Sequence, residues 1–203
     1  MRTFVFSVLA VAAFVVVSAA SVRAEFVVYD DFNTGSVPNT NLWMPLSGLT
    51  PSVSDGSLVV DAPAMGGAGG VRSTTTFGYG SYRFVLSAFT GGSVIFGMNS
   101  YSTPGVMYAI DALYLRDDGG GAIYKNQVSE AAVPAGWPPL ALPQTYTMIY
   151  HPDRMEIYRG ADLLFRETDV NKIPQDAAMR FEVFAYNSGK LGVDAVSFQP
   201  IAV

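Results

Sequence analysis

The stretch that decides the fold is Ser81-Tyr-Arg-Phe-Val-Leu-Ser-Ala-Phe89. Large apolar side chains occupy every second position, which puts Tyr82, Phe84 and Leu86 on one face of an extended chain and Arg83 on the other. A period of two is typical of a β-strand that buries one face. The stretch therefore predicts a strand that is packed against a core on one side only.

Stretches of the same kind recur along the chain, rich in β-branched and aromatic residues and separated by turn formers such as Asp55-Gly56. No stretch after residue 24 has a sustained helical period. The further predicted strands are Phe26–Phe32, Ser57–Asp61, Val71–Phe77, Ser93–Asn99, Met107–Leu115, Thr145–Tyr150, Arg154–Arg159, Arg180–Tyr186 and Leu191–Phe198. So many strands in one domain need two packed sheets. We expect an all-β, two-sheet antiparallel β-sandwich of jelly-roll type, spanning residues 25–203 as a single domain.

One segment departs from this pattern. Val128–Pro143 contains four prolines and Trp137, and predicts a long loop.

Composition removes several kinds of chemistry. The 203 residues are 50% hydrophobic and include no cysteine and one histidine, which excludes disulfides, thiolate metal sites and cysteine nucleophiles. With 12 basic and 17 acidic residues the net charge is −5, which argues against a nucleic-acid partner. Any catalysis would therefore have to depend on carboxylates.

Residues 1–24 have the pattern of a secretory signal peptide. Arg2 precedes an apolar run from Phe4 to Val17, and small residues lead to a cleavage site after Ala24. The run is short for a transmembrane helix, although an uncleaved anchor is the alternative. Cleavage removes Arg2 and Arg23 and leaves 179 residues with a net charge of −7. We expect a secreted, extracellular or periplasmic protein with no membrane span after the signal.

Several short motifs occur in an order that resembles a known family. They are Tyr29-Asp-Asp-Phe-Asn33, Asp55-Gly-Ser-Leu58, Phe77-Gly-Tyr-Gly-Ser-Tyr82 and Gly192-Val-Asp-Ala-Val-Ser-Phe-Gln199. Together they resemble the concanavalin A-like lectin/glucanase superfamily, and especially the family 16 glycoside hydrolases. The resemblance implies two stacked, curved antiparallel sheets, with a glycan held on the concave sheet.

The catalytic motif of that family is missing. Family 16 enzymes carry Glu-x-Asp-x-Glu on one strand, with a nucleophile and an acid/base flanking the scissile bond. The matching positions in this sequence are Ala109, Asp111 and Leu113, so both essential carboxylates are replaced. Asp111 and Glu182 are weak candidates for relocated acids. Asp111 could instead accept a sugar hydrogen bond or be a buried acid, and Glu182 could be a solvated or arginine-paired strand residue.

A glycan-binding face would combine aromatic platforms with polar side chains. The ligand-binding candidates are Asp111, Trp137, Tyr101, Asn99, Arg83, Arg180 and Tyr186. Trp137 could equally anchor its proline-rich loop.

A metal site is also implied by the resemblance. Many family members hold calcium on the convex side, and the matching positions are Asp31, Gly56 and Asp194. Calcium prefers oxygen ligands in extracellular proteins. The alternative is that Asp194 hydrogen-bonds the N-terminal strand without an ion.

These observations predict a secreted, non-catalytic, lectin-like protein that binds an extracellular or cell-wall polysaccharide. The alternatives are a family 16-type glycoside hydrolase with relocated acids and a structural cell-surface or matrix protein.

Overall fold

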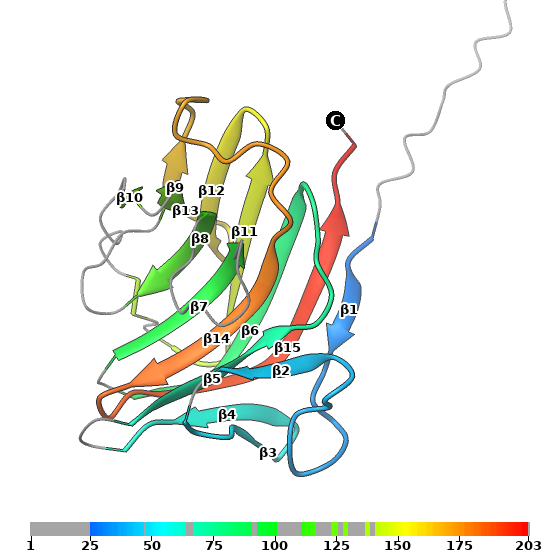
Figure 1. Cartoon of the computed structure of the whole chain (residues 1–203), viewed down its shortest axis with the longest axis vertical. Coiled ribbons are helices and arrows are strands. Elements are labelled where there is room, and N and C mark those ends of the chain that lie inside the picture. The colour runs from blue at the N-terminus through cyan, green and yellow to red at the C-terminus, as the bar shows by residue number, and fades with distance from the viewer. Residues whose placement is uncertain are drawn as a thin grey trace, which may run out of the picture.

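The computed structural model describes residues 25–46, 48–63, 67–90, 93–100, 111–116, 123–125, 128–129, 137–138 and 141–202. Within these residues all fifteen regular elements are β-strands, and the named strands pair antiparallel in two sheets (Figure 1). No helix in this part of the chain is long and apolar enough to cross a membrane. The predicted signal peptide, residues 1–24, lies outside the described residues.

In sheet A, the strand that contains Ser81–Phe89, β6, lies next to the last strand of the chain, β15. Its strands in order are β13 (Asp162–Glu167), β12 (Arg154–Arg159), β11 (Gln144–His151), β6 (Gly80–Thr90), β15 (Lys190–Pro200), β4 (Ser57–Asp61) and β3 (Ser52–Ser54), with β1 (Val27–Asp30) also paired to β15. Figure 1 shows β1 beside β15, so the first and last strands lie together.

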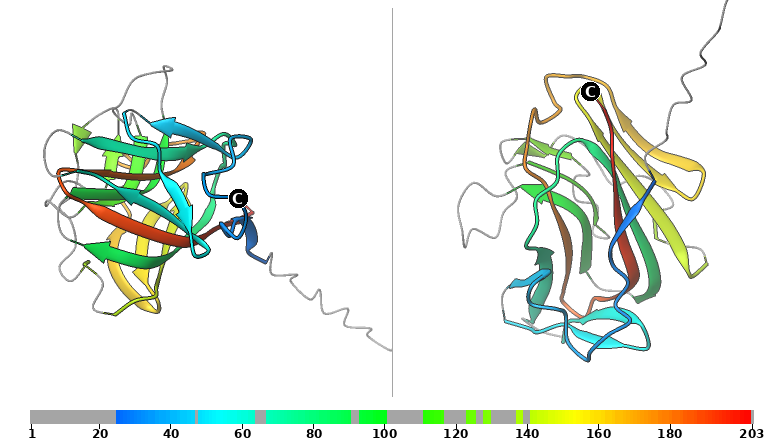
Figure 2. Two further views of the ribbon diagram at one scale, coloured as in Figure 1. Left: turned by 90° about the horizontal axis from the view of Figure 1, so that it is seen from below. Right: turned by 90° about the vertical axis from the view of Figure 1, so that its right-hand side faces the viewer.

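Sheet B contains the strands that carry most of the predicted binding residues. Its strands in order are β10 (Val128–Ser129), β9 (Ile123–Lys125), β8 (Asp111–Arg116), β7 (Ser93–Ser100), β14 (Arg180–Tyr186), β5 (Ala68–Ser73) and β2 (Trp43–Leu46). The two sheets form separate layers, which are seen edge-on in Figure 2.

Aromatic rings fill the space between the layers. Phe84 on β6 contacts Phe96 on β7 and Phe181 on β14, with ring centroids 5.3 and 5.4 Å apart. All three side chains have no exposed surface. Burial of one such side chain contributes about 1.5–3 kcal/mol, so the alternation seen in the sequence is what holds sheet A to sheet B.

The predicted two-sheet antiparallel sandwich is confirmed, and so is the burial of Tyr82, Phe84 and Leu86 on one face of β6. The sequence pattern did not predict β2, β3, β13 or β9, which has only three residues, and it predicted a loop for a segment that contains β10. β3 and β10 are too short for a repeating pattern, while β2 and β13 are edge strands whose alternation is weak. Pairing with a neighbouring strand, and not local pattern, defines them.

Candidate functional site

The outer face of sheet B is the face on which the family resemblance expects a glycan, because β8, the strand matched to the catalytic strand, belongs to this sheet. Alternate residues of β14 point into the core, where Phe181 and Val183 are fully buried. The residues between them therefore lie on the outer face.

The register places four predicted residues on this face. Arg180 lies opposite Asn99, and Glu182 and Tyr186 follow on the same side of β14. The structure thus brings together Asn99, Arg180, Glu182 and Tyr186, which are up to 87 positions apart in the sequence. Phe184 lies between the last two, with its ring centroid 6.1 Å from that of Tyr186.

Asn99 is the most buried polar side chain of this group. It is 2% exposed, and its amide nitrogen Nδ2 has no hydrogen-bond partner among the described residues. A buried polar group of this kind costs about 1–3 kcal/mol when it is left unsatisfied. Polar groups of native proteins that remain unsatisfied call for an explanation, and binding of a ligand is one.

Arg180 is held in place by backbone carbonyl groups. Its Nη1 donates hydrogen bonds to the carbonyl oxygens of Ser73, at 2.8 Å, and Thr74. Burial lowers the pKa of Arg180, and the positive charge of Arg72 lowers it further. Carbonyl groups orient the guanidinium without neutralising it, so this part of the face keeps a positive charge.

Glu182 is almost fully buried, at 6% exposure, and lies opposite Arg72 of β5 in the register. Its other neighbour in the register, Gly97 of β7, has no side chain; a Cβ there would lie 2.4 Å from the carbonyl oxygen of Leu113. The missing side chain allows β8 to approach closely and leaves Tyr114 of β8 in the same row as Glu182. Arg72 and Tyr114 were not predicted, although each follows the alternation of its own strand.

Asp111 is not part of this group. It shares a face of β8 with Leu113 and Leu115, both fully buried members of the core. Burial raises the pKa of Tyr150, a core residue of sheet A, and the negative charge of Asp111 adds to this rise. The structure therefore does not place Asp111 on the outer face of sheet B, because packing of Leu113 and Leu115 decides which side of β8 meets the core. Ala109 lies outside the described residues.

Trp137 is also placed in the core. It is fully buried, and its ring contacts those of Phe89, Phe96 and Tyr146 with centroids 5.2–5.7 Å apart. The hydroxyl of Tyr146 donates to the backbone carbonyl of Trp137 at 2.8 Å. Of the two roles considered for this residue, the structure places it as the anchor of its loop.

Two further candidates lie elsewhere. Arg83 is on the outer face of sheet A, where its guanidinium carbon is 3.4 Å from the centre of the Phe26 ring. Arg83 and the pair of Asn99 and Arg180 therefore lie on opposite outer faces of the sandwich. Tyr101 lies outside the described residues.

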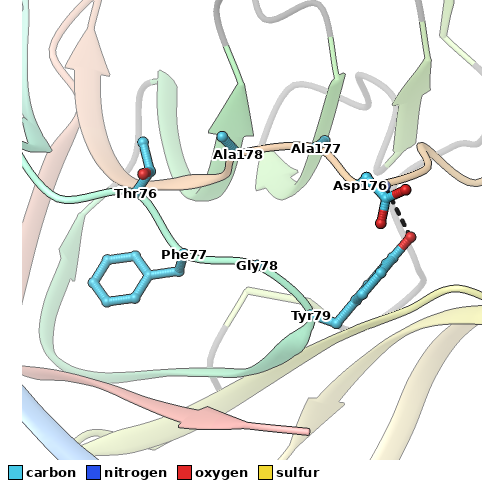
Figure 3. A pocket seen from close by; sticks show the side chains of 7 residues that line it. All are labelled: Thr76, Phe77, Gly78, Tyr79, Asp176, Ala177 and Ala178. Atoms are coloured by element: carbon cyan, nitrogen blue, oxygen red, sulfur yellow. Dashed lines mark hydrogen bonds between the residues drawn. The ribbon is translucent and has the colours of Figure 1, made fainter. Parts of the chain in front are cut away.

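A pocket of about 260 Å³ lies at one end of the sandwich, where the segments before β6 and before β14 run side by side (Figure 3). The hydroxyl of Tyr79 accepts a hydrogen bond from the backbone N–H of Asp176 at 2.8 Å, which links the two segments. Thr76 and Phe77 complete one wall. The pocket adjoins the row of Arg180, since Phe77 pairs with Met179.

The residues predicted to hold calcium offer oxygen donors of the right kind. Asp194 is partly buried, and its carboxylate accepts a hydrogen bond from the hydroxyl of Ser57 at 2.6 Å. Asp31 is exposed, and hydrogen bonds from Asn33 lower its pKa. A Cβ on Gly56 would lie 3.0 Å from the side-chain oxygen of Asn33. In the described part of the chain, no three His, Asp or Glu side chains form a metal-binding group.

The fold is a two-sheet antiparallel β-sandwich of jelly-roll type. Among solved structures, the chain is similar to a Bacillus licheniformis β-glucanase (TM-score 0.65, 18% identity, 88% of this chain and 98% of that chain). It is similar to SCLam, a non-specific endo-β-1,3(4)-glucanase of glycoside hydrolase family 16 (TM-score 0.61, 15% identity, 89% and 92%). It is also similar to the carbohydrate recognition domain of Emp47p (TM-score 0.61, 15% identity, 86% and 95%).

No protein-family model matches the chain, and no curated protein sequence matches it. At these identities the similarity establishes the fold alone. Both glucanases and a carbohydrate recognition domain share that fold, so the function depends on the site.

Proposed function

We propose that the protein is a secreted, non-catalytic carbohydrate-binding protein that recognises an extracellular or cell-wall polysaccharide on the outer face of sheet B. The observation that carries this proposal is the alignment of Asn99, Arg180, Glu182 and Tyr186 along β7 and β14 on that face. Aromatic rings stack on the apolar faces of sugars, and amide, guanidinium and carboxylate groups bind their hydroxyls.

The arrangement of carboxylates favours binding over hydrolysis. Glycoside hydrolysis of the family 16 type needs two carboxyl groups that flank one bond. Among the described strand residues of the outer face of sheet B, Glu182 is the only carboxylate, and β8 presents Ala112, Tyr114 and Arg116. Asp111 lies on the other side of the sheet, so it cannot form such a pair with Glu182.

The alternative functions make different predictions. A hydrolase with relocated acids would release reducing ends from a polysaccharide, and the Glu182→Gln variant would abolish that release. A structural matrix protein would bind no glycan and would associate through its exposed apolar residues, among which are Val27 and Val28 of β1.

Export is part of the proposal and depends on residues 1–24. N-terminal sequencing of the protein recovered outside the cytoplasm should begin at Glu25. Full-length protein in the membrane fraction would instead support the uncleaved anchor.

We also propose a structural calcium ion at Asp194, with carbonyl oxygens near Asp31 and Gly56. The support is that the partly buried Asp194 carboxylate has a serine hydroxyl as its hydrogen-bond donor and that no salt bridge joins it to a basic side chain in the described part of the chain. The ion would supply that charge and would join β1 to β15 and to the turn before β4.

A glycan array, followed by pull-down on the polysaccharides that bind, tests the main proposal. We expect Tyr186→Ala to reduce binding about two- to twelvefold, since stacking on one aromatic ring contributes about 0.5–1.5 kcal/mol. Tyr158→Ala is the matched control, because Tyr158 is a partly buried tyrosine on the outer face of sheet A. Absence of binding across β-glucans, galactans and mannans by the folded protein would refute the proposal.

A further inference from the structure

The row of sheet B that joins β14 to β7 presents two side chains that donate hydrogen bonds, Asn99 and Arg180. Arg180 and Asn99 occupy directly paired positions and lie on the same face. Within the part of the chain that the structure describes, the Nδ2 group of Asn99 has no hydrogen-bond partner, although the residue is only 2% exposed. A ligand that supplies an acceptor at this point removes the cost of that buried donor.

The second donor of the row is the guanidinium group of Arg180. In the described part of the chain its hydrogen bonds go to two backbone carbonyl groups, and no salt bridge joins it to a carboxylate. A neutral sugar hydroxyl would satisfy Asn99 but would leave this charge unbalanced. A carboxylate or sulfate group satisfies the Asn99 donor and also balances the charge of Arg180, because its oxygens accept several hydrogen bonds and guanidinium binds it in a forked geometry.

Most of the charged side chains around this row are positive, as Arg180 is. Arg72, Arg116 and Arg180 lie on the outer face of sheet B, and the carboxylate of Glu182 is the only acidic side chain that the described strand residues add there. The chain as a whole has a net charge of −5. A positive region on an acidic protein concentrates anionic ligands at that region and disfavours their binding elsewhere.

We infer that the row of Arg180 and Asn99 is a subsite for an oxyanion substituent, and that the polysaccharide is acidic and carries carboxylate or sulfate groups. This inference depends on the proposed glycan-binding function and names the chemical class of its ligand. Arg180 is partly exposed and receives the anion from solvent, while Asn99 donates from beneath it.

Matched polysaccharides test the inference and distinguish the two anions. Binding to polygalacturonate is compared with binding to the same polymer after methyl esterification, and binding to a sulfated galactan is compared with binding to its desulfated form. We expect one acidic polymer to bind at least tenfold more tightly than its neutral counterpart, which corresponds to about 1.4 kcal/mol. The pair that shows the difference identifies the anion.

Variants tie that preference to the row. Arg180→Gln should remove the preference for the acidic polymer, whereas Lys190→Gln, which also removes one positive charge but lies on β15 beside Asp61, should keep it. Asn99→Asp is a second variant that supplies a negative charge to Arg180 from within the protein and should also remove the preference.

The outcomes separate this inference from the proposed function. Equal binding of acidic and neutral polymers, unchanged in Arg180→Gln, would overturn the oxyanion subsite and leave the glycan-binding function intact. Absence of binding to all of these polymers and to the glycan array would overturn both. Loss of the acidic preference in Lys190→Gln as well would overturn the assignment of the subsite to the row.

Discussion

Replacement of Trp137 distinguishes a core residue from a sugar platform. The side chain has no exposed surface and packs against the rings of Phe89, Phe96 and Tyr146. Large-to-small substitution of a buried aromatic residue costs about 3–5 kcal/mol. We therefore expect Trp137→Ala to lower the free energy of unfolding by about that amount.

A conservative variant separates ring packing from hydrogen bonding. The indole Nε1 of Trp137 is buried and has no hydrogen-bond partner among the residues that the structure describes. A phenylalanine keeps most of the ring contacts and removes this unsatisfied donor, which offsets part of the lost volume. Trp137→Phe should therefore cost about 1 kcal/mol or less.

Urea denaturation followed by circular dichroism measures both variants. For a domain of this size 1 kcal/mol corresponds to about 2–4 °C in Tm, so Trp137→Ala should melt about 6–20 °C lower than the unmodified protein. Below the transition, each variant should bind glycan as the unmodified protein does. A Trp137→Ala protein of normal stability that has lost glycan binding would refute the placement of this side chain in the core.

Three further predictions concern other parts of the molecule. If calcium binds at Asp194, chelation should lower the Tm of the unmodified protein, because a ligand of the native state stabilises it by mass action. The Tm of the Asp194→Asn variant should not change on chelation. Equal Tm values of the unmodified protein with and without chelator would contradict the metal site. Burial raises the pKa of Tyr146 to about 12, above its value of about 10 in the unfolded chain, so this contribution to stability is complete below pH 10 and is lost as the pH rises towards 12. The tyrosinate absorbance that a Tyr146→Phe variant lacks should develop near pH 12, and its development near pH 10 in the folded protein would contradict the shift. Glu156 is 4% exposed and accepts a hydrogen bond from Nε of Arg166 at 2.6 Å; Glu156→Gln should cost about 1–3 kcal/mol in urea denaturation, and an unchanged midpoint would show that the pair contributes nothing.

The alternation of apolar residues predicted the two layers of the fold, but it did not show for every strand which side faces the core. On β6 the large side chains Tyr82, Phe84 and Leu86 mark the buried face without ambiguity. On β8 every residue from Ala112 to Leu115 is buried, so the pattern does not reveal which face meets the core. The match to the catalytic motif put Asp111 and Leu113 on the outer side of β8. In the structure, Leu113 packs in the core, so this side of β8 faces inwards.

The sequence indicated the individual residues of the candidate site, but it did not indicate that they lie next to one another. Asn99 and Arg180 are 81 positions apart, and only the pairing of β7 with β14 makes them neighbours. Sequence pattern gives no account of such long-range pairing, because register depends on the whole sheet. Trp137 was ambiguous for a different reason, since a tryptophan in a proline-rich segment has no neighbouring periodicity from which to infer burial.

The most direct test of the account is to locate bound glycan on the protein. Oligosaccharides cut from the polysaccharide that binds best should be titrated into the isotope-labelled protein while the side-chain resonances are followed by NMR. We expect shifts of the Asn99 amide, the Arg180 guanidinium and the Tyr186 ring, with little change at Tyr158 on sheet A. Shifts confined to sheet A, or none from any oligosaccharide, would contradict the claim that the outer face of sheet B binds a glycan.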